Sequence, residues 1–543
     1  MKGNYTIALF LSLCMGTALI GGCGQQECTQ KKTDTLAQNE TTADRKTGED
    51  VRPDEGGSTN SDYHVTWDDM AEINVVIPTL AAIPDGLSQV EEAVNEITES
   101  TINTHVNIEL LEPGSYDQQV SLKITSGEQV DLVMTNATGS TSFTTMVSQN
   151  QLQDITQLMK SYAPKAMAEV GDAVKGTTVD GRIMAFPAYR NYYSGAYIMM
   201  RTDVLEDLGL VEKAESMTSF SEYEEILETV KNSEKWKALV PIVPTRAGSI
   251  LPWPRYYGYT ENFSDTQFID TLGNILSCVG VLNDDEASTV INVYASEAYK
   301  RNYERTKEWY DAGYIYKDAV NTAELGTELI KSGVGFSMFN SMGVGAELAA
   351  NAQCGRDMTC VLIAAKPVNT SDCATFTYAV PVTAKAPEAA MTFVEMMFND
   401  ENILNLMVWG IEGKDYEINE SGIAQKVGEK GSPSYYLPSW NSVNEFNTIP
   451  CDPWDMESWN NQKTIMDEAV MSDYLGFSLN TNSLSNETSA VNTVLNEYTK
   501  QLGAGVASET DYETFIKKLN ATGIEKIVSA YQDALNDWLA KTN

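Results

Sequence analysis

Apolar residues between positions 70 and 135 form a repeated pattern of short runs and helical spacings. Short apolar runs, typical of strands buried on both faces, occur at residues 73–77, 106–111 and 130–134. Helical spacing separates these runs, at residues 90–97 and 116–124. The order predicts parallel strands joined by right-handed crossovers in a doubly wound sheet. In such sheets ligands bind beyond the carboxyl ends of the strands, where Asn136 follows the third run.

A second pattern occupies residues 181–209. An apolar strand at residues 182–186 ends at Pro187, and another follows at residues 196–200. Between them lies a polar aromatic segment that contains Tyr189, Arg190, Tyr192 and Tyr193. A short helix follows at residues 203–208, with Thr202 as its expected N-cap and Gly209 at its end. Two apolar strands around such a segment indicate a chain that crosses between two lobes.

Further along the chain the elements are less regularly spaced. Helices are expected at residues 220–231, 297–312 and 387–398, and strands at residues 239–243, 329–340 and 377–383. The segments that begin at Ser88 and Ser219 both have the form of a capping box, with Glu three residues later. Arg246 follows the strand at residues 239–243, and Asn340 ends the one at residues 329–340, so both are candidate site residues.

Several segments together resemble the extracellular solute-binding proteins of ABC importers. The segments that carry the resemblance are DGRIMAFP, TDVLEDLG, LQDITQLMKSYAP and WYDAGYI. WGIEGKDY at residues 409–416, LGF at residues 475–477 and the closing helix at residues 523–539 resemble a large lipoprotein subgroup of that family. No single motif is decisive, but their order is specific.

The resemblance implies an α/β, two-lobed, periplasmic-binding-protein-like fold of type II, with doubly wound sheets, hinge crossings and a helical C-terminal part. Lobe 1 is expected at residues 63–190 and 334–383, and lobe 2 at residues 191–333 and 384–543. The implied function is capture of a small molecule, in this family commonly an oligosaccharide, and its delivery to ABC permease subunits. We expect a monomer that needs no cofactor and no metal, and that is not an enzyme.

The N-terminus has the pattern of an export signal. A basic residue, an apolar stretch of about fifteen residues and small residues before Cys23 predict a signal peptide at residues 1–22. The small residues before Cys23 match a bacterial lipobox, which implies lipidation of Cys23 and an anchor on the outer face of the plasma membrane. The alternative is an ordinary signal peptide with an incidental cysteine. Residues 23–62 are polar and are expected to form a flexible tether.

Charge excludes one class of partner. The chain has 37 Lys and Arg against 76 Asp and Glu, a formal net charge of -39. Nucleic acid is not an expected partner, because phosphate binding requires clustered basic residues. Only two histidines are present, so the chain has few histidines that could bind zinc or act as a general base.

Aromatic residues in polar surroundings are the main candidates for ligand contact, because an aromatic ring packs against the C–H face of a sugar. The candidate ligand-binding residues are Asn136, Tyr189, Arg190, Tyr192, Tyr193, Arg246, Trp253, Tyr256, Tyr257, Asn340, Glu412 and Trp440. The alternative is that these aromatics pack loops and lobe interfaces.

Other functions remain open at this point. A glycan-degrading surface protein needs an acid–base pair, and with 76 acidic residues close pairs arise by chance. A sensory lipoprotein, or an importer component for peptides, has the same features. Pairing among Cys278, Cys354, Cys360, Cys373 and Cys451 cannot be deduced from the sequence.

Overall fold

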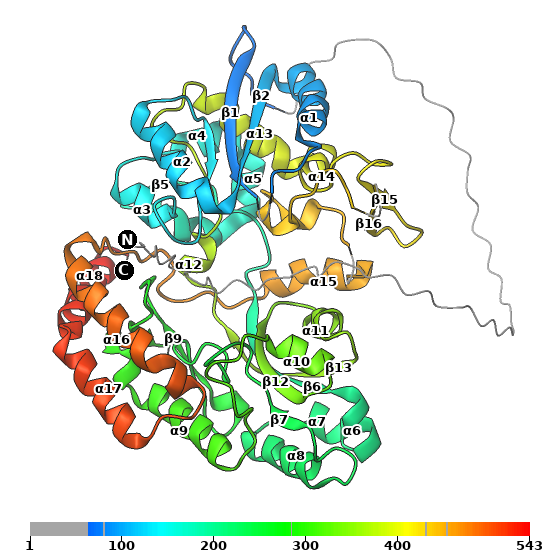
Figure 1. Ribbon diagram of the computed structural model, residues 1–543. Helices are drawn as coiled ribbons and strands as arrows, with labels where there is room; N and C mark the ends of the chain where they lie inside the picture. The colour runs from blue at the N-terminus through cyan, green and yellow to red at the C-terminus, as the bar shows by residue number, and fades with distance from the viewer. Residues whose placement is uncertain (1–62, 80–81, 284, 429–431, 452–453, 543) are drawn as a thin grey trace, which may run out of the picture. The chain divides into compact units, whose positions relative to one another are not determined.

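The computed structural model describes residues 63–79, 82–283, 285–428, 432–451 and 454–542. The expected signal peptide, Cys23 and the tether lie outside these residues and stay predictions. Among the described helices, none combines the length and the apolar character that a membrane crossing requires. The described chain has a mixed α/β fold that contains three four-stranded sheets (Figure 1).

The first sheet has the strand order β14-β3-β1-β2. Its strands are β1 (Ala71–Pro78), β2 (Thr104–Leu111), β3 (Leu132–Met134) and β14 (Tyr378–Ala379). β1 pairs in parallel with both β2 and β3, and β14 is antiparallel to β3. The three apolar runs predicted as strands at the start of the chain are therefore confirmed as neighbours in one sheet.

Helices around this sheet cover it with apolar side chains. They are α1 (Leu87–Ile102), α2 (Pro113–Ser126), α3 (Phe143–Ser148), α4 (Thr156–Tyr162), α5 (Pro164–Val170), α13 (Pro387–Asn399) and α14 (Glu401–Trp409). A 3₁₀ helix (Gly171–Thr177) leads into the hairpin of β4 (Thr178–Val179) and β5 (Arg182–Ile183). α13 packs against α1, α4, α5, α14 and β1, so every residue from Ala389 to Phe398 is buried.

The second sheet has the order β13-β6-β12-β7. Its strands are β6 (Ser194–Arg201), β7 (Val240–Ile242), β12 (Gly335–Met342) and β13 (Met358–Lys366). The helices of this region are α6 (Thr202–Leu208), α7 (Val211–Glu215), α8 (Phe220–Asn232), α10 (Gly326–Lys331) and α11 (Ala346–Cys354). An aromatic core forms beneath β6 and β12, where Trp309 stacks on Phe339 at 5.4 Å.

The third sheet, β11-β10-β9-β8, is antiparallel and lies beside the C-terminal helices (Figure 1). Its strands are β8 (Tyr257–Gly258), β9 (Gln267–Asp270), β10 (Val279–Leu282) and β11 (Ile291–Asn292). The helices are α9 (Glu297–Asp311), α16 (Ser485–Gly503), α17 (Glu509–Ala521) and α18 (Ile524–Thr542). α16 contacts α9, and α18 contacts β10 and β11, so the end of the chain closes one continuous core.

Strand pairing differs from the division of the chain that we expected. Residues 334–383 were assigned to lobe 1, but β12 and β13 both pair with β6 in the second sheet. Residues 384–543 were assigned to lobe 2, but α13 packs on β1 of the first sheet, and α14 packs on α1 and α13. The assignment of residues to lobes was wrong because apolar runs predict strands but do not specify which strands they pair with. We propose lobe 1 at residues 63–186 and 378–447, and lobe 2 at residues 194–366 and 474–542.

The two expected capping boxes have different outcomes. Ser219 is the N-cap of α8, where its side chain accepts a hydrogen bond from the Glu222 N–H. The prediction at Ser88 is wrong, because α1 begins at Leu87 with Gly86 at its N-cap. Gly86 donates its N–H to the Ser434 carbonyl oxygen at 2.9 Å, so a distant segment fixes where this helix starts.

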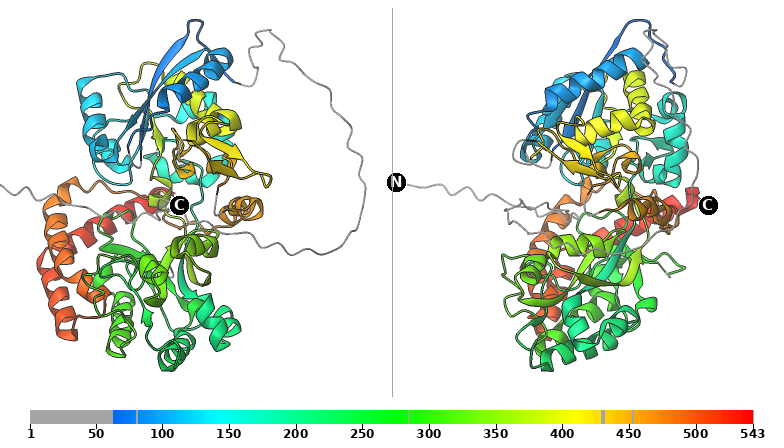
Figure 2. Two further views of the ribbon diagram at one scale, coloured as in Figure 1. Left: turned by 45° about the vertical axis from the view of Figure 1, so that its right-hand side comes forward. Right: turned by 90° about the vertical axis from the view of Figure 1, so that its right-hand side faces the viewer.

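Three segments connect the two lobes, and we call them the crossing segments: residues 187–193, 367–377 and 468–473. They can be followed in Figure 2 between the first and second sheets. The second and third run side by side, since Val368 N–H bonds to Val470 and Ser472 N–H bonds to Val368, both at 2.8 Å. The first is held at Tyr189, which pairs with Asn444 in a parallel bridge. The second contains α12 (Thr370–Cys373).

Candidate functional site

Arg190 lies at the centre of the crossing segments. Its guanidinium carbon lies 5.5 Å from the ring centroid of Tyr192 and 6.0 Å from that of Phe376, which is the geometry of a cation–π contact. Its Nη2 donates a hydrogen bond of 3.2 Å to the Asp372 carbonyl oxygen, whereas its buried Nε has no partner in the described protein. Arg190 therefore joins the first and second crossing segments and still holds an unused donor.

Trp440 completes this aromatic cluster from a different part of the chain. Its ring is half-buried and lies 4.9 Å from that of Phe376. Phe376 has a φ of 58°, a left-handed backbone conformation that is unusual for an aromatic residue and is often found at functional sites. Trp440 belongs to a 3₁₀ turn (Ser439–Asn441) that is anchored to lobe 1, because Asn441 Nδ2 donates to the Pro78 carbonyl at 3.2 Å. This anchor positions the Trp440 ring.

A second group of aromatic residues comes from lobe 2 and from the end of the first crossing segment. Tyr193 and Tyr197 are half-buried, and their hydroxyl oxygens are 3.4 Å apart. Trp253 and Tyr256 form an edge contact at 5.9 Å, and Trp253 also has a left-handed backbone, with a φ of 44°. Tyr257 is fully buried. Five of these aromatic side chains thus come from two short stretches near the start of β6 and of β8.

Two of the predicted tyrosines have structural contacts. Tyr189 is buried against Phe398 and Phe446, with ring centroids 5.7 and 5.1 Å away. Tyr192 is also buried, and its hydroxyl donates to the Ala188 carbonyl at 2.5 Å. The Tyr189 ring therefore packs against lobe 1, and the Tyr192 hydroxyl bonds within the first crossing segment.

The residues predicted at strand ends are more dispersed. Asn136 follows β3 and is half-buried, and Asn340 lies near the end of β12 with its Oδ1 accepting the Ser341 N–H at 2.9 Å. Thr245, directly before Arg246, donates its hydroxyl to the Phe339 carbonyl at 2.6 Å, which ties the end of β7 to β12. Arg246 itself is exposed.

Glu412 lies apart from the aromatic cluster. It is exposed in the turn before β15 (Tyr416–Ile418), which forms a hairpin with β16 (Ala424–Lys426), and the neighbouring Lys414 contacts Gln89 of α1. The buried residue of this turn is Asp415, which accepts N–H groups from Ile411 at 3.0 Å and Ser434 at 2.8 Å. A Cβ at Gly410 would lie 2.6 Å from Asp415 Oδ2. The WGIEGKDY segment thus has a structural role at Gly410 and Asp415.

Asp415 gives a testable pH dependence. Burial raises the pKa of its carboxyl, but hydrogen bonds from Ser434 and from backbone N–H groups outweigh this effect, and the net pKa is lowered. Its contribution to stability is therefore complete above the unfolded pKa of about 4 and is lost as the pH falls through the lower folded value. We expect Asp415→Asn to lower the unfolding free energy at pH 7 by about 1–3 kcal/mol and to reduce the loss between about pH 5 and 3.

Urea unfolding at several pH values measures this difference. Glu412→Gln, on the same turn but exposed, is the matched control and is expected to follow the unmodified protein. Equal acid sensitivity of the Asp415→Asn variant and the unmodified protein would contradict the argument.

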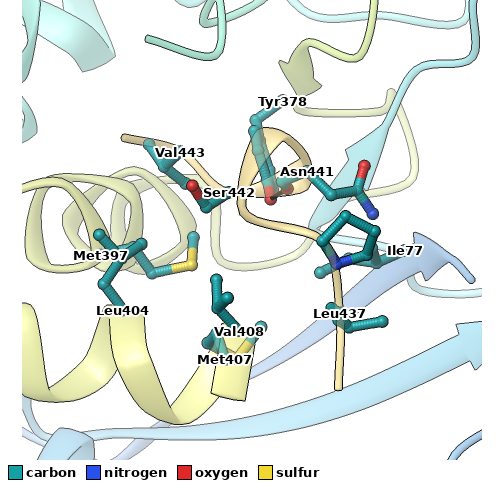
Figure 3. Close-up of a pocket in the computed structure, with 11 residues that line it drawn as sticks. Ile77, Tyr378, Met397, Leu404, Met407, Val408, Leu437, Asn441, Ser442 and Val443 are labelled. Carbon is teal, nitrogen blue, oxygen red and sulfur yellow. Dashed lines mark hydrogen bonds between the residues drawn. The ribbon is translucent and has the colours of Figure 1, made fainter. Parts of the chain in front are cut away.

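The small cavity shown in Figure 3 does not have the size of a sugar site. It lies between α13, α14 and residues 437–443, has a volume of about 10 Å³ and is lined mainly by apolar side chains such as Met397 and Leu404. A volume of this size is at the lower limit for one water molecule. Asn441, which also lines this cavity, has a buried Oδ1 without a hydrogen-bond partner in the described protein.

Several residues at the crossing segments were missed in the sequence. Lys366 is buried and forms an ion pair with Asp372, and the Asp372 carboxylate also accepts the Asn369 N–H at 2.9 Å. Glu445 accepts the Asn191 N–H at 3.2 Å, and burial raises the pKa of its carboxyl against the opposing effects of Asn191 and Arg190. Glu445 has no local signal, because its partner Asn191 lies in the first crossing segment, whereas Lys366 and Asp372 are only six residues apart and their pairing is local.

The described residues contain no group of three or more His, Cys, Asp or Glu side chains arranged to hold a metal ion. Within the same part of the chain, Cys278, Cys354, Cys360 and Cys373 are free thiols. Cys354 and Cys360 lie in one apolar cluster beside β13, and Cys373 is buried in α12.

Two α/β lobes, joined by crossing segments that carry a polar aromatic cluster, define the class of periplasmic-binding-protein-like folds. The sequence profile of the bacterial extracellular solute-binding protein family matches residues 92–411, more than half of the chain. The chain therefore belongs to this family, whose members are extracellular. A domain family of unknown function matches residues 473–540.

Known proteins with similar sequence and structure agree with this fold. A carbohydrate ABC transporter substrate-binding protein of Streptococcus pneumoniae is 23% identical over 474 residues, covering 84% of this chain and 89% of the relative. The N-glycan transport solute binding protein of the same organism has a TM-score of 0.70 at 20% identity, covering 87% of this chain and 100% of that one. A structure of that protein in complex with Man5GlcNAc has a TM-score of 0.59 at 20% identity. The match covers 87% of this chain and 99% of that one. An ABC-transporter substrate-binding protein of S. pneumoniae in complex with kestose has a TM-score of 0.56 at 13% identity. The match covers 87% of this chain and 100% of that one.

Proposed function

We propose that this protein captures an oligosaccharide between its two lobes and delivers it to the permease subunits of an ABC importer. The observation that carries the proposal is the cluster of Arg190, Tyr192, Phe376 and Trp440, which gathers at the crossing segments from three parts of the chain. Aromatic faces and a guanidinium with an unused donor suit the C–H faces and hydroxyls of a sugar. The named ligands of the similar proteins support the same ligand class.

We propose that the ligand contacts the predicted residues that keep exposed or half-buried side chains near the crossing segments. These are Asn136, Arg190, Tyr193, Tyr256, Asn340 and Trp440. Binding then brings the lobes together by a hinge motion of the crossing segments. The ligand leaves chemically unchanged, so the protein acts as a binding component and not as an enzyme.

We also propose that the protein belongs to the lipoprotein subgroup marked by the WGIEGKDY segment and that a lipid on Cys23 anchors it to the plasma membrane. A single thioether-linked lipid unit with two acyl chains is enough for stable anchoring. Membrane fractionation of cells that express Cys23→Ala checks the anchor. Release of the protein into the medium is expected, and retention in the membrane fraction would refute the lipid attachment.

A thermal-shift assay on the purified full chain tests the proposed function. The probes are Man5GlcNAc, kestose and a set of short peptides. At a hundred times its dissociation constant, a ligand that binds only the folded state adds about 2.7 kcal/mol to stability. A shift with a saccharide that is recovered intact supports the proposal, cleavage of the saccharide indicates an enzyme, and a shift with peptides alone replaces the ligand class.

A further inference from the structure

The loop that follows β3, residues 136–142, is a polar segment at the carboxyl end of an inner strand of the first sheet. Its sequence is NATGSTS, without a charged residue. The side chains of residues 136–138 and Ser140 are half-buried, whereas Thr141 and Ser142 at its base are buried. Ligands of open α/β sheets bind beyond the carboxyl ends of such strands, so the loop lies where a ligand is expected.

Asp117 of α2 holds this loop. Its Oδ1 accepts the Thr141 N–H at 3.3 Å and also the Thr141 hydroxyl, and its backbone carbonyl accepts the Ser140 hydroxyl at 3.2 Å. At Gly139, where φ is 89°, an added Cβ would overlap Asp117 Oδ2, so the loop backbone packs directly on the carboxylate. The Asn136 N–H closes the loop by donating to the Thr141 carbonyl at 2.9 Å.

Tyr116, the residue before Asp117, fixes α2 against the sheet. Its buried hydroxyl donates at 2.5 Å to the carbonyl oxygen of Met134, the last residue of β3. Adjacent residues of one helix therefore hold the end of β3 and the loop that follows it. An anchor on a helix of the scaffold positions a binding loop more accurately than contacts within the loop alone.

The start of the loop is bonded to the segment that carries the aromatic cluster. Thr135, directly before the loop, donates its N–H to the Thr377 carbonyl at 2.7 Å, and the Thr135 hydroxyl accepts the Thr377 N–H at 3.0 Å. Both threonines are fully buried. Phe376 directly precedes Thr377, and its ring lies 4.9 Å from that of Trp440. This bonded pair thus links the first loop residue, Asn136, to the aromatic cluster.

We propose that residues 136–142 are a preformed part of the oligosaccharide site and that Asp117 is the positioning residue that holds them beside the aromatic cluster. The inference rests on the proposed function. The amide and hydroxyl side chains of this uncharged loop donate and accept hydrogen bonds, as the hydroxyls of a neutral sugar do. Because Asp117 orders the loop before the ligand arrives, its removal adds the cost of ordering the loop to binding.

Asp117→Ala tests the positioning role, with Asp117→Asn as the conservative variant. Alanine removes the acceptor of both Thr141 groups, so we expect the dissociation constant of the bound saccharide to rise about fivefold to tenfold. The amide oxygen of Asp117→Asn still accepts from Thr141, so its affinity should stay within about twofold of the unmodified protein. Glu112→Ala, at an exposed carboxylate next to the same helix, is the matched control with unchanged affinity. Isothermal titration calorimetry with Man5GlcNAc and kestose supplies the affinities.

Hydrogen exchange of the ligand-free full chain reports on the loop itself. The N–H groups of Asn136, Thr141 and Ser142 are all bonded in this structure. Asp117→Ala is expected to speed exchange in residues 136–142 and to leave β1 and β2 unchanged. In the unmodified protein, the saccharide that binds is expected to slow exchange in the same loop.

The outcomes separate this inference from the function on which it rests. If the unmodified protein binds neither saccharide, the proposed function fails and the inference fails with it. If it binds, and Asp117→Ala binds equally well despite faster exchange in the loop, only the inference is refuted. Equal losses of affinity in Asp117→Ala and Asp117→Asn, each with a lower melting temperature, would also refute it. Gly139→Ala forces the loop away from Asp117 and should raise the dissociation constant even if Asp117→Ala does not fold.

Discussion

Trp440→Ala is expected to weaken oligosaccharide binding by about 30- to 100-fold. Truncating a central aromatic residue of a binding site commonly costs 2 kcal/mol or more, and the ring itself supplies the surface on which a sugar face packs. The Trp440 ring is half-buried and supported by Phe376 at 4.9 Å, so its orientation is set before the ligand arrives. A pre-positioned ring loses little conformational freedom on binding, which increases its contribution.

The stability of the folded protein should change little, because the neighbouring Asn441 still anchors the turn to Pro78. Isothermal titration calorimetry of the variant with Man5GlcNAc measures the affinity, and its melting temperature reports on the fold. Trp236→Ala is the matched control, since that ring lies over Arg201 in lobe 2 and its Nε1 bonds to Asp207. Equal affinities of the Trp440→Ala and Trp236→Ala variants would place the ligand away from Trp440.

Asp131→Ala is expected to lower the unfolding free energy by about 3–5 kcal/mol. Asp131 is fully buried at the start of β3, and its Oδ1 accepts the N–H groups of Lys385 at 2.7 Å and Ala386 at 2.9 Å. Its Oδ2 accepts the Asn74 N–H and the Gln129 side-chain amide, both at 2.9 Å. Alanine leaves these donors without an acceptor inside the protein, and each buried unsatisfied donor costs about 1–3 kcal/mol.

Asp131 also connects the first sheet to the start of α13, which explains the size of the effect. Asp131→Asn should also lower the unfolding free energy, because the NH₂ of its amide would face N–H groups that are themselves donors. Urea unfolding followed by circular dichroism measures the loss, with the exposed Asp473→Ala as the control. A loss below about 1 kcal/mol for Asp131→Ala would show that water or a shift of α13 replaces the carboxylate.

The sequence by itself determined the local elements. The apolar runs at residues 73–77, 106–111 and 130–134 became β1, β2 and β3, because strands buried on both faces require continuous apolar side chains. Gly209 ends α6 in the left-handed conformation, and Ser219 caps α8, because both effects depend on atoms within a few residues. The aromatic segment at residues 189–193 was also visible as a lobe crossing before its partners were known.

Only the tertiary structure decided which elements meet. β12 has an apolar pattern that suits either sheet, and its pairing with β6 follows from long-range packing. Trp440 was a candidate in the sequence and Phe376 was not, and only the fold shows that two distant segments bring their rings together. Tyr257 was a candidate in the sequence, but only the structure shows that it is fully buried with a hydroxyl that has no hydrogen-bond partner in the described protein. Local chemistry sets helices, strands and caps, whereas a site between lobes depends on contacts that no local stretch of sequence contains.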